Sequence, residues 1–222
     1  MQDILDSLSS HGLPRSIKKR TVLLYQGEVP RSAYYLKKGV IKAYSINSAG
    51  NEQIVSFYVA GDLFPISWIF GPVSSTLYYY EAMTDCEVVA FDKKTLHDMV
   101  YGKPRLLLKM FTYSMNNYTS AQMRITALEQ SRANEKIMFT LYYLLFRYGQ
   151  EVKPGMFAVR LGLTHAIIAE MVGLTRETTA VELNKLKKVN AISYNSKEYV
   201  INRMALERLM GEDSFSSLID QT

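Results

Sequence analysis

The sequence predicts an α+β fold with an N-terminal β-roll of the jelly-roll type, one long helix and a C-terminal winged helix-turn-helix. Short runs rich in β-branched and aromatic residues fill residues 15 to about 95. Residues 105–131 contain no glycine or proline, and a two-helix pattern followed by a hairpin occupies the C-terminal third. We therefore expect a sensor-type roll over 1–103, a dimerisation helix and hinge over 104–133, and the winged domain over 134–222.

Five apolar runs in the N-terminal region indicate strands. They read TVLLY, SAYYL, VIKAYSI, QIVSFYV and CEVVAF. Glycines recur every ten to twelve residues, at Gly27, Gly39, Gly50, Gly61 and Gly71. Each is expected at a corner with positive φ, where glycine is favoured. Regular spacing of this kind predicts a small β-barrel or roll rather than an α/β fold.

The long helix begins at Pro104, which suits a first helical position. Steps of four and three residues along it define an apolar seam of the a/d type. The seam consists of Leu107, Phe111, Ser114, Tyr118, Ala121, Ile125 and Leu128. Leu106, Met110 and Met115 form a second apolar face. A helix that only covers its own domain has one such face, so two faces favour packing on the roll and on a second copy of the chain.

Residues 134–149 predict a further helix, with Asn134 as its N-cap and Gly149 at its end. Its apolar positions would cover the C-terminal domain. A loop is expected over 150–155, followed by a strand in MFAVRL and a hairpin in AISYNSKEYVI that turns at Asn195-Ser196. With the two-helix corner between them, this order of elements is typical of a winged helix-turn-helix.

The corner lies in LTHAIIAEMVGLTRETTAVELNKLKK, residues 163–188. Ala169 is small enough for a close helix crossing, and Gly173 is expected in the turn with positive φ. Thr164 and Thr175 can cap the two helices through their hydroxyl groups, and such caps also bind phosphate. The shared core is predicted to consist of Ile168, Val172, Leu174, Leu183 and Leu186.

Arg176 and Glu177 stand on the exposed first turn of the second helix. Arginine can donate two hydrogen bonds to guanine, and glutamate can accept one from cytosine. A carboxylate facing DNA phosphates is unfavourable unless it makes such a bond, so Glu177 is the more informative of the two. The alternative is a solvated pair in which Glu177 only favours the helix dipole.

Composition limits the other classes of function. The net charge of +5 suits a polyanionic partner. Residues 150–222, however, carry equal numbers of acidic and basic side chains. Any electrostatic contribution of this region to DNA binding therefore depends on where single cations such as Lys185 are placed. The single cysteine, Cys86, excludes an iron–sulfur site built from cysteines and is expected in a buried strand. We expect a cytoplasmic protein without signal peptide, membrane span or metal, and the sequence lacks the common enzyme motifs.

The chain resembles the CRP/FNR family of bacterial transcription regulators over roughly residues 10 to 205. The most specific segments are residues 27–64 of the roll and IAEMVGLTRETTAVELNKLKK at 168–188. The resemblance implies a cyclic-nucleotide-binding-type roll, a homodimer joined by the long helix, and double-stranded DNA as partner, with RNA polymerase a further candidate. It also implies base reading by Arg176, Glu177 and Val181. Phosphate contacts are then expected from Thr164, His165, Thr175, Thr178 and Lys185.

Departures from the family pattern concern both ends of the chain. Val181 stands where members often have an arginine, so it can contact a thymine methyl group but cannot read guanine. Glu182 occupies a position that is usually apolar, and the sequence does not explain it. In the roll, Ile66 replaces the glutamate that holds the ribose of cyclic AMP, and Leu77-Tyr78 replaces the Arg-Ser pair that holds its phosphate.

Cyclic AMP is therefore not expected to bind in the usual way. The effector pocket implied by the resemblance consists of Ile66, Trp68, Leu77, Tyr78, Tyr80, Ala121 and Gln122. Its aromatic residues indicate either a site for an apolar effector or a pocket filled by its own side chains. The leading interpretation is a homodimeric regulator that binds a two-fold symmetric DNA site. The alternative is an effector-binding signalling module whose helix-turn-helix contacts proteins.

Overall fold

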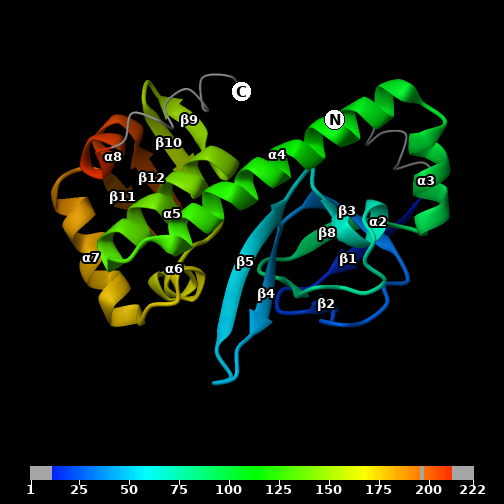
Figure 1. Cartoon of the computed structure of the whole chain (residues 1–222), viewed down its shortest axis with the longest axis horizontal. Coiled ribbons are helices and arrows are strands. Elements are labelled where there is room, and N and C mark those ends of the chain that lie inside the picture. The colour runs from blue at the N-terminus through cyan, green and yellow to red at the C-terminus, as the bar shows by residue number, and fades with distance from the viewer. Residues whose placement is uncertain (1–11, 196–197, 212–222) are drawn as a thin grey trace. The chain divides into compact units, whose positions relative to one another are not determined.

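The computed structural model describes residues 12–195 and 198–211, which form the elements labelled in Figure 1. The chain divides into two compact units, Met1–Met115 and Asn116–Thr222, and the boundary falls inside helix α4 (Pro104–Glu129). The division into 1–103, 104–133 and 134–222 stays a prediction.

The first unit contains two antiparallel four-stranded sheets, which confirms the β-roll. One sheet has the order β1-β8-β3-β6, from Leu13–Ile17, Cys86–Phe91, Ala33–Lys38 and Leu63–Phe64. The other has the order β2-β7-β4-β5, from Val22–Leu24, Tyr79–Ala82, Val40–Ile46 and Glu52–Val59. All five apolar runs form strands. Three of these strands lie outside the runs: β1, which contains Pro14, β6, which has only two residues, and β7.

An aromatic core holds the two sheets together. Phe64 lies at its centre, with its ring centroid 5.5 Å from that of Tyr34, 5.5 Å from Tyr80 and 5.1 Å from Tyr58. These residues come from four different strands, and Phe64 is fully buried. Alternate residues of each strand reach this core because side chains on a strand alternate between its two faces.

A second apolar cluster joins the roll to α2 (Ile66–Phe70), α3 (Lys93–Tyr101) and the first turns of α4. Leu106 and Met110 belong to it, as predicted, but Met115 is exposed and Tyr113 takes its place. The Tyr113 hydroxyl donates to the Asp62 carboxylate at 3.0 Å and accepts from the Leu63 N–H at 3.2 Å. Tyr113 therefore accepts from the buried Leu63 N–H and gives the Asp62 carboxylate a further donor, neither of which a methionine side chain can do.

Four of the five regularly spaced glycines have positive φ, but Gly71 does not. Its φ is −96°, and it ends α2 in an extended conformation. A Cβ atom at Gly71 would stand 2.4 Å from the carbonyl oxygen of Ser67. Glycine is thus required there by close approach to the helix rather than by its backbone angle.

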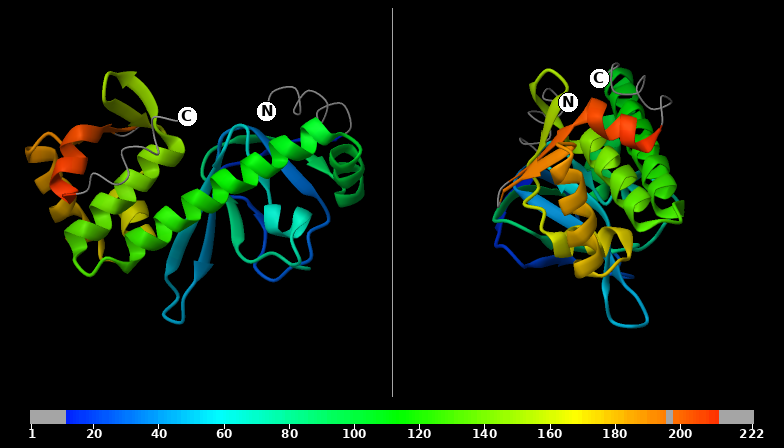
Figure 2. Two further views of the ribbon diagram at one scale, coloured as in Figure 1. Left: turned by 45° about the horizontal axis from the view of Figure 1, so that its top comes forward. Right: turned by 90° about the vertical axis from the view of Figure 1, so that its left-hand side faces the viewer.

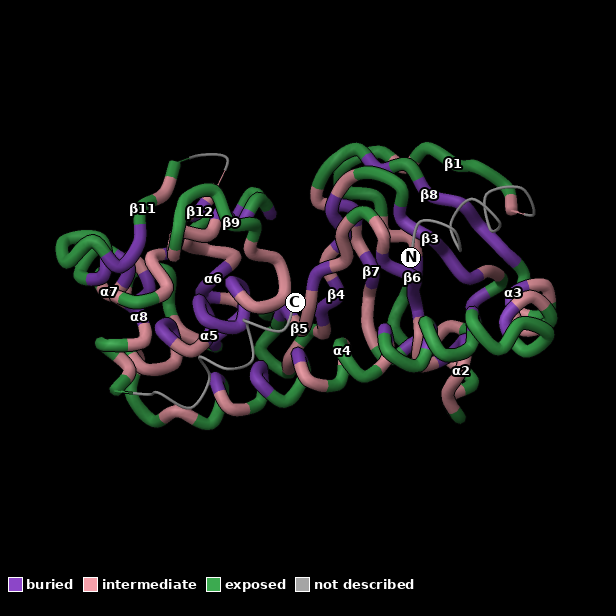
Figure 3. The backbone as a smooth tube through the Cα atoms, turned by 90° about the horizontal axis from the view of Figure 1, so that it is seen from above, coloured by how far each residue is buried: buried purple, intermediate pink, exposed green. Residues whose placement is uncertain are grey.

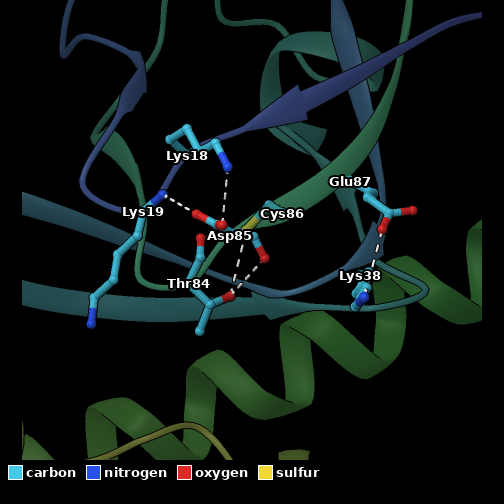
Figure 4. A network of polar contacts seen from close by, with 7 residues as sticks. All are labelled: Lys18, Lys19, Lys38, Thr84, Asp85, Cys86 and Glu87. Atoms are coloured by element: carbon cyan, nitrogen blue, oxygen red, sulfur yellow. Dashed lines mark hydrogen bonds and ion pairs between the residues drawn. The ribbon is translucent and has the colours of Figure 1, made fainter.

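Polar contacts join the turn before β8 to the residues that follow β1, and β8 itself to the end of β3 (Figure 4). The Asp85 carboxylate accepts from the Lys19 N–H at 2.9 Å and from Lys18 Nζ at 3.3 Å, and these contacts lower the pKa of Asp85. Lys38 and Glu87 form an exposed ion pair at 3.7 Å. Cys86 is buried beside them, as expected, and its Sγ would lie 2.5 Å from a Cβ placed on Gly39.

The second unit contains the C-terminal part of α4, helix α5 (Ala133–Tyr148) and a winged helix-turn-helix (Figure 2). Its helices α6, α7 and α8 span His165–Val172, Arg176–Lys188 and Arg203–Met210. Its sheet has the order β11-β12-β10-β9, from Ile192–Tyr194, Tyr199–Asn202, Met156–Val159 and Gln150–Lys153. No helix in the described ranges has the length and apolar character that crossing a membrane requires.

Three local expectations for this unit need correction or fall outside the structure. Asn134 is not the N-cap of α5, because the helix begins at Ala133 and Arg132 stands at the cap without a side-chain hydrogen bond. Residues 150–153 form strand β9 rather than a loop, pairing with β10 through main-chain contacts that their mostly polar side chains do not reveal. Ser196 of the expected hairpin turn lies outside the described residues.

Candidate nucleic-acid interface

Helices α6 and α7 contact one another across the turn at Gly173, whose φ of 67° is the left-handed conformation expected there. Both predicted caps are present. The Thr164 hydroxyl accepts from the Ile167 N–H at 3.2 Å, and the Thr175 hydroxyl accepts from the Thr178 N–H at 3.1 Å. The capped N-termini are thereby fixed against the fraying that unsatisfied N–H groups permit.

The inner faces of both helices are buried against each other and against α5. Ala169 is buried at the crossing, as its size suggested, and Leu174 is half-buried. The other members of the predicted core are all buried, namely Ile168, Val172, Leu183 and Leu186. Thr179, which the sequence reasoning missed, is also fully buried. Its spacing of four residues from Leu183 is the signal that could have revealed it.

The outer face of α7 begins with the three candidate base readers. Arg176 and Glu177 are exposed on the first turn, and Val181 follows one turn later with 54% of its surface exposed. Glu177 and Val181 are four residues apart and thus share one side of the helix. Thr178 is half-buried, and its Oγ1 accepts from the Thr175 hydroxyl at 3.0 Å.

A tyrosine of the wing joins both helices, and the sequence reasoning did not identify it. The Tyr194 ring stands edge-on to that of His165, at a centroid distance of 5.2 Å, and stacks on Tyr199 at 4.9 Å. Its hydroxyl donates to Asn184 at 3.0 Å, and Lys187 Nζ lies 4.7 Å from the ring centroid. Tyr194 therefore connects the first residue of α6 with the last turns of α7.

Glu182 has a partner that its sequence position did not suggest. Its carboxylate accepts from Lys185 Nζ at 2.7 Å. The pair lies at a shallow cavity of about 320 Å³ that Asn134, Met138, Leu186, Val189 and Leu209 also line. Glu182 therefore faces an open groove rather than a closed core. Lys185, a predicted phosphate contact, carries its charge on this side of α7.

The predicted seam lies on the exposed side of α4, which alternates between buried and exposed residues along its length (Figure 3). Phe111 is 60% exposed and Tyr118 is 59% exposed. Leu107, Ala121, Ile125 and Leu128 are also exposed, and Ser114 is half-buried. A row of exposed apolar side chains along one helix, interrupted only at Ser114, is typical of a protein–protein contact.

The residues of the implied effector pocket are distributed over two core clusters of the first unit and over helix α4, and the pocket itself stays a prediction. Trp68 and Ile66 belong to the cluster around α2, α3 and α4, whereas Tyr80 and Tyr78 belong to the core between the sheets. Leu77 is exposed. Ala121 and Gln122 lie in the second unit, exposed on α4, where Gln122 Nε2 donates to the Tyr118 hydroxyl at 2.6 Å.

Neighbouring side chains cover the buried aromatic residues of this set. Trp68 is 7% exposed and Tyr80 is 2% exposed. Lys93 packs against Trp68. Its Nζ donates to the Trp68 carbonyl at 2.6 Å and lies 5.1 Å from the centroid of the Trp68 ring. Tyr80 thus packs between the two sheets and Trp68 packs with α2, α3 and α4, while the choice between an effector site and a filled pocket stays a prediction.

Fold and site together define a regulator with an N-terminal β-roll and a DNA-binding helix-turn-helix, and comparison with known proteins agrees. Residues 14–101 match the cyclic nucleotide-binding domain family, and residues 135–209 match the Crp-like helix-turn-helix domain family. The structure of FixK2 from Bradyrhizobium japonicum is similar with a TM-score of 0.72 at 22% identity, covering 89% of this chain and 96% of that one.

Two similar curated proteins extend over most of the chain. The anaerobic regulatory protein of Aggregatibacter actinomycetemcomitans is 30% identical over 91% of this chain and 77% of its own length. The fumarate and nitrate reduction regulatory protein of Vibrio cholerae is 30% identical over 94% of this chain and 82% of its own. The chain belongs to the CRP/FNR family of transcription regulators. Both relatives are named as regulators, not as enzymes.

Proposed function

We propose that this regulator binds a two-fold symmetric duplex site as a homodimer, with α7 of each protomer in the major groove. The observation that carries the proposal is the division of α7 into two faces. Thr179, Leu183 and Leu186 are buried, while Arg176, Glu177 and Val181 are exposed. A helix held by its inner face and led by exposed polar side chains has the geometry of a recognition helix.

Each exposed residue has a distinct role in this proposal. Arg176 donates to guanine O6 and N7, Glu177 accepts from cytosine N4, and Val181 packs against a thymine methyl group. Because Val181 has no polar group, the third contact distinguishes bases by shape alone. The operator is then expected to combine a G·C pair with an adjacent thymine in each half-site.

Phosphate contacts fix the helix in the groove but do not read sequence. We assign them to Thr164 and Thr175, which lead the two helices, to their neighbours His165 and Thr178, and to Lys185. Lys185 would exchange its bond to Glu182 for a phosphate. That exchange leaves the Glu182 carboxylate without a partner near the DNA phosphates. Lys185 is therefore expected to contribute less to the binding affinity than a lysine that starts unpaired.

The exposed stripe on α4 supports dimerisation. Two copies of α4 packed along Leu107, Phe111, Tyr118, Ile125 and Leu128 would cover an apolar surface that water otherwise contacts. Half-sites of a two-fold symmetric operator are centred one helical turn, or a multiple of it, apart. The distance between half-sites in the selected DNA therefore tests the dimer as well as the contact of α7 with the major groove.

Selection of bound duplexes from random sequence tests the proposal. We expect an inverted repeat whose affinity falls steeply with salt concentration. Arg176→Ala should relax the preference at one base pair of each half-site. Binding without sequence preference, or no binding, would instead favour a signalling module whose helix-turn-helix contacts proteins.

Effector control and polymerase contact are further parts of the proposal. Ile66, Leu77 and Tyr78 offer no cation for a cyclic phosphate, so calorimetry should show no binding of cyclic AMP to the roll. A small apolar effector would have to displace packed side chains such as Trp68. Transcription reconstituted with RNA polymerase and the selected site would show whether the regulator activates or represses.

A further inference from the structure

His165 occupies an unusual place on the surface proposed to meet DNA. It is the first residue of α6, directly after the Thr164 cap, and it is half-buried. The edge-on ring of Tyr194 covers one side of it. Part of its surface stays accessible to solvent, next to the capped N-termini of the two helices. Histidine is the side chain whose charge changes near neutral pH.

Two cations, Arg176 and Lys187, lie on the α7 side of His165 and its Tyr194 neighbour. Arg176, at the start of α7, acts on His165 directly, and Lys187 lies over the Tyr194 ring that contacts it. Burial and the charge of Arg176 lower the pKa of His165 below its usual value. Both effects favour the neutral form of the ring in the free protein.

A DNA phosphate beside His165 would favour the charged form of the ring over the neutral form. A nearby anion favours the imidazolium form and partly screens Arg176, so the pKa of His165 rises on binding. The proton comes from solvent and adds to the free ring nitrogen, which then donates to the phosphate. Tyr194 keeps the ring in place during this change, because it is itself tied to Asn184 and stacked on Tyr199.

We propose that His165 takes up a proton as DNA docks, which makes the affinity of this regulator for its operator increase as pH falls through the neutral range. The inference rests on the proposed DNA-binding function. Its direction follows from linkage, since the bound state holds more protons than the free state and is favoured by acidification.

Two substitutions separate charge from shape at this position. His165→Gln keeps a polar side chain that stays neutral at every pH, and His165→Arg carries a permanent charge. Affinity for the selected duplex is measured by fluorescence anisotropy between pH 8.0 and about pH 6 at constant ionic strength. Wild-type affinity should rise by roughly three- to tenfold per half-site, because one unit of pKa shift corresponds to tenfold.

The variants should lose this dependence in opposite ways. His165→Gln should bind weakly at both pH values, and His165→Arg should bind tightly at both. Calorimetry in buffers of different ionisation enthalpy should show proton uptake by the wild type at pH 7 and much less by His165→Gln. His97→Gln is the matched control, since His97 lies in the first unit, against the Ile69 carbonyl at 2.6 Å, and should leave the pH dependence unchanged.

The outcomes distinguish this inference from the function on which it rests. Equal pH dependence in wild type and His165→Gln, with sequence-specific binding intact, would overturn the inference alone. Absence of sequence-specific binding at every pH would overturn both. If the factor by which His165→Gln weakens binding relative to wild type is the same at every pH, His165 makes a contact without proton uptake, and the inference is also overturned.

Discussion

Arg124 of α4 donates from Nη2 to the main-chain carbonyl of Met171 in the last turn of α6. Its Nη1 donates to the Thr140 hydroxyl of α5 at 3.3 Å, and its guanidinium lies 5.9 Å from the centroid of the Tyr143 ring. Arg124 is 6% exposed, and burial lowers its pKa. One buried cation thus joins the long helix to the end of α6, where the carbonyl groups carry partial negative charge.

Arg124→Met should destabilise the second unit. The apolar stem remains, but the Met171 carbonyl and the Thr140 hydroxyl lose a charged hydrogen-bond partner. The free energy of unfolding in urea should fall by about 1.5–3 kcal/mol, the range for hydrogen bonds to charged groups. The matched control is Arg132→Met, since Arg132 makes an exposed ion pair with Glu135 at 3.6 Å, and it should change stability by less than about 1 kcal/mol. Equal losses in the two variants would contradict this role of Arg124.

Phe111→Asp should weaken the dimer without unfolding the chain. Phe111 is exposed in the monomer, so a carboxylate there costs little in folding but is buried in the proposed interface, where an unpaired charge is strongly unfavourable. Sedimentation equilibrium should show a wild-type dimer and a variant shifted toward monomer. Thr112→Asp, one residue away and outside the seam, is the control and should stay dimeric. If Phe111→Asp also stays dimeric, the stripe on α4 is not the interface.

The sequence predicted elements with strong local patterns and missed those that depend on distant partners. The caps at Thr164 and Thr175, the turn at Gly173 and the core of α6 and α7 all follow from neighbouring residues. Strand β9 does not, because its polar residues form a strand only by pairing with β10. The same holds for Tyr113. It is buried where the sequence predicted Met115, and its partner there is Asp62, which is far away in the sequence.

Contacts of Tyr194 and Glu182 could not have been predicted for a similar reason. Tyr194 joins three elements through its ring and hydroxyl, and no spacing rule marks such a residue. Glu182 looked misplaced because the sequence pattern assumes a closed core. The groove between α5, α7 and α8 is open there, which three-dimensional packing alone determines. The roles proposed for the base-reading residues remain predictions.

Glu182→Leu should be tolerated. The carboxylate forms an i,i+3 ion pair with Lys185, a class of pair worth at most a few tenths of a kcal/mol, while Met138 and Leu186 offer apolar contacts in the groove. The free energy of unfolding, measured by thermal denaturation, should therefore fall by no more than about 0.5 kcal/mol, or rise. The variant also leaves Lys185 without its partner, so DNA binding should become somewhat tighter. A large loss of stability would show that Glu182 has a structural role beyond this pair.

Tyr44 should make the roll sensitive to alkali. Burial, followed by the neighbouring Glu52 and Glu81 carboxylates, raises the pKa of Tyr44 to about 12 from 10.0. A raised pKa in the folded state means that its contribution is fully present below pH 10 and is lost as pH rises from 10 toward 12. Urea unfolding at pH 8 and pH 11 should show a smaller loss of stability in Tyr44→Phe than in wild type. Identical losses would contradict the raised pKa.

The central claim is that α7 reads bases through its first turn, and one affinity measurement tests it most directly. Wild type, Arg176→Ala and Arg176→Lys are titrated with the selected duplex and with a duplex in which one G·C pair of each half-site is replaced. Wild type should discriminate by roughly 1–3 kcal/mol per half-site, Arg176→Ala should bind both duplexes equally, and Arg176→Lys should keep only part of the discrimination because lysine lacks the planar fork. If Arg176→Ala lowers affinity for every sequence but keeps the full preference at every position, Arg176 contacts the DNA backbone, and the account of direct base reading is wrong.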